Sequence, residues 1–132
     1  MYAYTHLQTK TDIDFSYYRE LAFEDQEFYF GLIQQTSRCF ANLKNEYTDA
    51  LLDNKHTDLR ELLHKIKPTI KGLKIVALDD YFEEAKLLTN QNDTWNMDAA
   101  LTNIRNVCTI IGELINALDK ELFLEKQLTN KK

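Results

Sequence analysis

Residues that form turns are scarce in this chain. Among its 132 residues there are three Gly and one Pro. Sheets and long loops need many such residues, because tight turns depend on backbone angles that Gly and Pro adopt readily. The length is typical of one domain and is sufficient for a self-supporting core. The sequence therefore predicts a single all-α domain built from a few long helices.

Apolar residues recur at steps of three and four, the spacing of one helix face. This pattern predicts a short helix over residues 14–22, with Asp14 as its cap, and four longer helices over 24–53, 57–73, 78–88 and 95–124. Thr57 is the expected cap of the third helix. The last helix is expected to bury a stripe formed by Leu101, Ile104, Cys108, Ile111, Ile115, Leu118 and Leu122.

Helices with one apolar side each and short connections favour an antiparallel four-helix bundle, here with a short extra N-terminal helix. Residues 1–13 are predicted to form an N-terminal arm, 14–128 the bundle and 129–132 a frayed C-terminus. The clearest turn is predicted at 90–94.

Several classes of protein are disfavoured by composition. The formal charge of −5 argues against nucleic-acid binding, which needs a basic patch. No apolar stretch approaches the length of a membrane span, and the N-terminus does not resemble a signal peptide, so we expect a cytoplasmic protein without a membrane anchor. Cys39 and Cys108 are expected to be buried free thiols, because both fall among apolar residues of predicted helices and no CxxC motif is present.

One histidine is predicted to point into solvent. A helix turns about 100° per residue, so Leu62 and Ile66 point about 160° away from His64, and their burial directs the imidazole outward. The residues on the same polar side are Arg60, Glu61, Lys67, Pro68 and Lys71. An exposed neutral imidazole is a nucleophile near pH 7, and nearby cations offset the charge of a phosphoryl group. The same pattern also fits an ordinary solvated helix face.

The run His64-Lys65-Ile66-Lys67-Pro68-Thr69-Ile70-Lys71 resembles the signature of histidine-containing phosphotransfer (HPt) domains. In that family the active His is followed by Lys three residues later and then by two small residues. The resemblance extends over about residues 14–124, with a long acidic-then-aromatic helix before the His helix and a helix pair after it.

The resemblance implies a phosphorelay intermediate. His64 would carry a phosphoryl group between the aspartates of response-regulator receiver domains, supplied by a hybrid sensor histidine kinase. Lys67 would steady that group, with Lys71 as a second cation, and Lys86 from the next helix would orient the imidazole. Arg60, Glu61 and Pro68 would border the docked receiver. Such a module needs no cofactor or metal of its own, and a monomer is expected.

Two departures from the family pattern concern glycine. Pro68 stands four residues after the His, where the family usually has Gly, and we expect a bend in the helix there. Ten residues after the His another frequent Gly is replaced by Lys74, while Gly72 stands two positions earlier.

Three alternatives follow from the residues. A degenerate HPt-like bundle would bind receivers without transferring phosphate. A metal enzyme would use the Glu61-x-x-His64 step, which di-iron bundles use twice, but His6 and His56 are predicted in irregular segments without such a Glu. An ATP-dependent kinase is disfavoured, because no Gly-rich phosphate loop is present.

Overall fold

The computed structural model describes residues 12–90 and 95–130, and all regular structure within them is helical. The elements are α2 (Ser16–Ala22), α3 (Gln26–Leu52), α4 (His56–Gly72), α5 (Asp79–Thr89) and α6 (Met97–Asn130). The predicted all-α class and the order of the helices are therefore confirmed. Most of the predicted arm, His6, and residues 91–94 and 131–132 lie outside the described residues.

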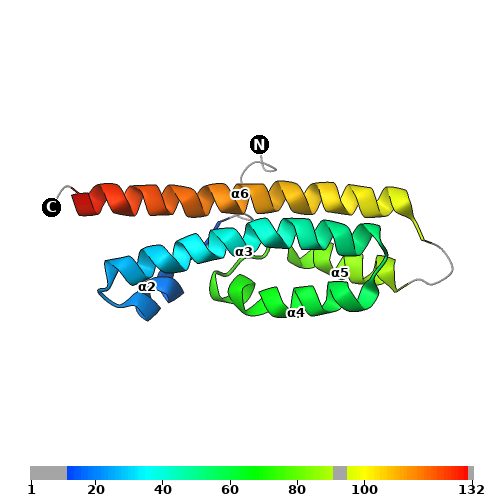
Figure 1. The fold of residues 1–132 in the computed structure, drawn as a ribbon, viewed down its shortest axis with the longest axis horizontal. Coiled ribbons are helices and arrows are strands. Elements are labelled where there is room, and N and C mark those ends of the chain that lie inside the picture. The colour runs from blue at the N-terminus through cyan, green and yellow to red at the C-terminus, as the bar shows by residue number, and fades with distance from the viewer. Residues whose placement is uncertain (1–11, 91–94, 131–132) are drawn as a thin grey trace.

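The longest helix, α6, runs the length of the molecule beside α3 (Figure 1). Helix α4 packs on α3, and α5 packs on both α4 and α6. The short α2 packs on α3 near the point where α3 begins (Figure 1). Each long helix thus has two long neighbours, and the apolar stripes meet between them in one core.

The core is built from the apolar faces of the long helices. Helix α3 contributes Ile33, Phe40, Leu43 and Tyr47, and α4 contributes residues such as Leu59. Helix α5 adds Phe82 and Ala85. All of these side chains are at most 8 % exposed.

The buried face of α6 agrees with the prediction only in part. Ile104, Ile111 and Leu118 are buried as predicted, and Cys108, Ile115 and Leu122 are half-buried against the core. Leu101 is 43 % exposed, whereas Val107 and Leu114 are fully buried although they are not in the predicted stripe. Apolar residues occur on several sides of this helix, so periodicity alone does not decide which side faces the core. The observed buried face is Ala100, Asn103, Ile104, Val107, Ile111, Leu114 and Leu118.

The connection between α3 and α4 is tighter than predicted. Asn54 has a φ of 53°, and the Lys55 N–H donates to the Ala50 carbonyl at 2.9 Å, the pattern of a left-handed helix stop. The chain then enters α4 at once, with Lys55 as N-cap and no side-chain cap bond. The prediction that Thr57 caps this helix is therefore wrong, because Thr57 lies inside it.

Two further sequence expectations need correction. Phe15 is the N-cap of α2, although the Asp14 carboxylate does accept a hydrogen bond from the Ser16 N–H at 2.9 Å. Cys39 is exposed and Cys108 is half-buried, so neither is a fully buried thiol. Cys39 precedes the buried Phe40 by one residue, which rotates it about 100° towards the edge of the apolar stripe. Among the described helices, none has the length and apolar character needed to cross a membrane.

Candidate functional site

The side chain of His64 lies on the outer side of α4. It is exposed, whereas its neighbours Leu63 and Ile66 are each 8 % exposed and pack in the core. Leu62 is half-buried on the flank that faces α3. Because the core holds the opposite side of the helix, the imidazole is left accessible to solvent and to a partner.

A shallow hollow of about 330 Å³ surrounds His64, lined also by Thr57, Arg60 and Glu61. These residues precede His64 by seven, four and three positions, so all lie on one face of α4. Within the described residues, no group bonds to the His64 ring. Both ring nitrogens are therefore available for chemistry or for binding.

A second concavity lies beside His64, between α4 and α5. We call it the lysine groove; it has a volume of about 570 Å³ and contains Lys67, Lys71, Lys74 and Lys86. Its apolar residues include Leu63, Ile70, Ile75 and Phe82, and its acidic residues are Asp79, Asp80 and Glu83. His64 does not line this groove, but Lys67 and Lys71 follow it by three and seven positions on α4. These two lysines therefore connect the face that carries His64 to the groove.

The four lysines differ in how far their charge is compensated. Lys86 is paired with Glu83 at 2.8 Å between Nζ and Oε1, and Lys74 with Asp14 at 3.4 Å. Lys67 and Lys71 make no ion pair with any described residue. Of the four groove lysines, the two that share α4 with His64 are thus the ones left free to meet an incoming anion.

The remaining candidate residues are placed as follows. Arg60 and Glu61 are exposed in the His64 hollow, and Pro68 is exposed one turn beyond His64. The chain is helical on both sides of Pro68, so the proline does not end α4. Lys86 lies in the lysine groove and not in the His64 hollow, and its ammonium group is held by its own neighbour Glu83.

His56 is not the loop residue that the sequence suggests. It is the first residue of α4 and is half-buried, and its Nδ1 lies 2.8 Å from the Thr89 hydroxyl. This bond joins the start of α4 to the end of α5. A signal in the sequence was the Asn54-Lys55 pair, since Asn is a frequent left-handed stop that lets the next helix begin early.

The described residues contain no group of three or more His, Cys, Asp and Glu side chains able to hold a metal ion. Glu61 and His64 both lie at the surface, away from the interior where bundle metal sites are built. Comparison with protein-family profiles, with curated proteins and with solved structures finds no match to this chain.

Proposed function

We propose that this protein is an HPt-type phosphorelay intermediate. His64 accepts a phosphoryl group from the aspartate of a receiver domain or hybrid sensor histidine kinase, and passes it to another receiver. The observation that carries the proposal is the exposed, unpartnered imidazole of His64, followed on α4 by the uncompensated lysines Lys67 and Lys71. The proposal includes a monomeric, cytoplasmic protein without its own kinase activity or cofactor.

The packing of the helices supports an antiparallel four-helix bundle, the fold that this function uses. Helices α3, α4, α5 and α6 form a closed series in which each packs on the next and α6 packs on α3. The chain reverses its direction at each connection (Figure 1). The short α2 is the extra N-terminal helix.

The position of one missing family glycine also supports the proposal. Lys74, ten residues after His64, has a φ of 56°, which is the left-handed conformation that Gly adopts without strain. The Ile75 N–H donates to the Ile70 carbonyl at 3.0 Å and closes the helix there. A backbone that favours Gly thus occurs where the family often has Gly.

In the proposed reaction a lone pair on an imidazole nitrogen attacks the phosphorus of an aspartyl phosphate. The N–P bond forms as the P–O bond to the receiver breaks, and the aspartate leaves as a carboxylate. The phosphorylated ring is then a cation, and it becomes neutral when the nitrogen that did not attack gives its proton to water. A metal ion held by the receiver assists the in-line transfer, and Lys67 and Lys71 offset the charge that arrives on His64.

The test is incubation with a phosphorylated receiver domain, followed by mapping of acid-labile phosphate. His64→Gln should abolish labelling and change the free energy of unfolding by no more than about 0.5 kcal/mol, as is usual at an exposed site. His56→Gln is the matched control on the same helix and should still be labelled. Labelling of His64→Gln, or of no residue in wild type, would contradict the proposal.

A second candidate is a degenerate bundle that binds a receiver without transfer. Pro68 favours it, because its exposed ring stands where the family has a small residue and borders any partner that approaches His64. This candidate predicts saturable receiver binding together with absence of phosphohistidine, so the same experiment separates the two.

A further inference from the structure

The connection between α2 and α3 has an unusual combination of residues. Over residues 20–28, which we call the acidic elbow, there are four acidic side chains and no basic one. Its large apolar residues are also exposed: Leu21 and Phe28 at 49 % each and Phe23 at 85 %. Acidic and apolar side chains therefore share one solvent-facing segment.

The stability of the fold does not explain why a Phe occupies position 23. It has a φ of 57° and a ψ of −116°, a conformation in which residues with a Cβ are strained and Gly is not. Strained residues persist where the surrounding structure imposes the conformation, and they cluster at functional sites. At 85 % exposure, burial does not account for the aromatic ring.

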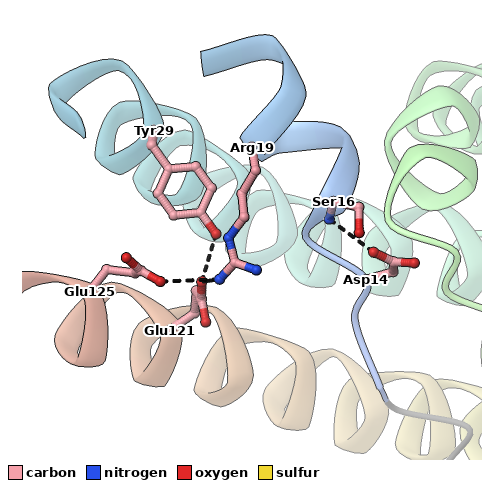
Figure 2. A network of polar contacts seen from close by, with 6 residues as sticks. All are labelled: Asp14, Ser16, Arg19, Tyr29, Glu121 and Glu125. Atoms are coloured by element: carbon pink, nitrogen blue, oxygen red, sulfur yellow. Dashed lines mark hydrogen bonds and ion pairs between the residues drawn. The ribbon is translucent and has the colours of Figure 1, made fainter. Parts of the chain in front are cut away.

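Polar contacts anchor the acidic elbow to α6. The Arg19 guanidinium is 2.5 Å from Glu121 and 3.1 Å from Glu125, both on α6. The Tyr29 hydroxyl donates to the same Glu121 at 2.6 Å, and Arg19 lies over the Tyr29 ring (Figure 2). These contacts tie the end of α2 and the start of α3 to α6 on the two sides of Phe23. The ring is thus presented from an anchored segment.

A hollow of about 150 Å³ lies beside Phe23, and its lining includes Glu24, Asp25 and Glu125. The cation in this lining is Arg19, whose charge is already met by Glu121 and Glu125. Glu24 has no ion pair with a described residue. The hollow therefore combines an aromatic edge with uncompensated negative charge, a surface suited to a Lys or Arg side chain beside an apolar one.

We propose that the acidic elbow is a docking surface for a basic amphipathic helix of another protein. Phe23 supplies the apolar anchor, and Glu24 with the other elbow carboxylates selects cationic partners. A second copy of this chain fits poorly, because two acidic elbows facing each other repel. The same charge disfavours an anionic membrane surface. The proposal does not depend on phosphoryl transfer at His64.

The test uses a synthetic peptide of about 18 Lys and Leu residues patterned as an amphipathic helix, and a second peptide with Glu in place of Lys. Binding to the full chain is measured by calorimetry and by NMR mapping of backbone amide shifts. The basic peptide should bind saturably with shifts centred on residues 20–28, and the acidic peptide should not bind. Phe23→Ser should weaken binding at least about tenfold, and Glu24→Gln should weaken it with a smaller dependence on salt.

Two further variants test whether a loss of peptide binding reflects the docking surface itself. They control for unfolding and for non-specific binding to any exposed Phe. Phe123→Ser removes another exposed Phe, 60 % accessible on α6, and should leave the affinity unchanged. Phe23→Gly should relieve the backbone strain and retain the fold, but its affinity for the basic peptide should still fall. Absence of binding, equal binding by Phe23→Ser and wild type, or shifts away from the elbow would overturn the proposal. So would self-association that Phe23→Ser abolishes, since it would identify a second copy as the occupant. His64→Gln should bind the peptide with wild-type affinity, so the docking proposal and the phosphotransfer proposal can be contradicted separately.

Discussion

At the scale of single residues, the chemistry proposed for α4 depends on charges that the fold leaves unpaired. Lys74 and Lys86 meet Asp14 and Glu83, whereas Lys67 and Lys71 meet no described acid. Exposed lysines without partners contribute little to stability. Their conspicuous property is therefore the positive charge that they place beside His64.

Replacing both lysines should affect transfer and not folding. We expect Lys67→Ala with Lys71→Ala to slow phosphorylation of His64 or shorten the phosphohistidine lifetime, because the added charge is then offset less. Each single variant should have a partial effect, since the two cations can substitute for each other. The free energy of unfolding should change by no more than about 0.5 kcal/mol. Lys44→Ala, at an exposed position on α3, is the matched control. Wild-type rate and lifetime in the double variant would show that these cations have no chemical role.

At the scale of the helix, Pro68 is the unusual feature of α4. It removes the N–H that would bond to the His64 carbonyl, and its ring crowds that carbonyl. The surrounding helix nevertheless continues to Gly72, held by the buried Ile66 and Ile70. Tertiary packing thus maintains a helix that is locally unfavourable.

Pro68→Ala should stabilise the protein, because it restores a hydrogen-bond donor and improves helix propensity. Up to about 3 kcal/mol is available if the native helix carries the full cost of an interior proline. Urea unfolding measures this gain. If the shape of α4 around Pro68 sets the angle of docking, the variant should also slow transfer with its cognate receiver. Equal transfer rates in wild type and Pro68→Ala would remove Pro68 from the functional argument.

The sequence predicts where the helices lie along the chain better than it predicts where each helix ends or which helices pack together. On α3 the spacing of Ile33, Phe40 and Tyr47 identifies the buried side. On α6 the predicted stripe does so only in part, because Ile111 is buried as predicted, whereas Leu101 is exposed and Leu114 is buried instead. The outward direction predicted for His64 needs only its own helix. The lysine groove and the bond of His56 to Thr89, in contrast, arise only when α5 packs beside α4. The Glu83–Lys86 pair is different, because its three-residue spacing on one helix is visible in the sequence.

At the scale of the whole molecule, one buried polar network joins three helices. Asn103 of α6 is fully buried; it accepts a hydrogen bond from the Tyr47 hydroxyl of α3. Its amide nitrogen donates to the Tyr81 carbonyl at 2.9 Å and to Glu84 at 2.6 Å, both on α5. A buried amide with these partners fixes how α3, α5 and α6 align, because a shifted helix would leave polar groups unsatisfied.

Asn103→Leu should destabilise the protein by about 1–3 kcal/mol, since it leaves the buried Tyr47 hydroxyl without its partner. Adding Tyr47→Phe should recover part of the loss, because the orphaned hydroxyl is then removed. Asn116→Leu, at an exposed position on the same helix, should have little effect. Urea unfolding of the four variants gives the coupling energy. Strict additivity of Asn103→Leu and Tyr47→Phe would contradict a network that acts as a unit.

The same network makes stability depend on alkaline pH. Burial, and then the charge of Glu84, raise the pKa of Tyr47 above its usual value near 10. The unfolded chain therefore loses the Tyr47 proton at a lower pH than the folded protein. The stability that this protonated hydroxyl contributes is complete below pH of about 10 and declines above it, by up to about 1.4 kcal/mol per pH unit.

Tyr47→Phe should be less stable at neutral pH, but its free energy of unfolding should decline less steeply between about pH 10 and 12. Tyr17→Phe makes the same chemical change at an exposed ring and is the matched control. Parallel curves for wild type and Tyr47→Phe would mean that Tyr47 ionises as readily in the folded protein as in the unfolded chain, and that its place among the three helices does not hold the proton.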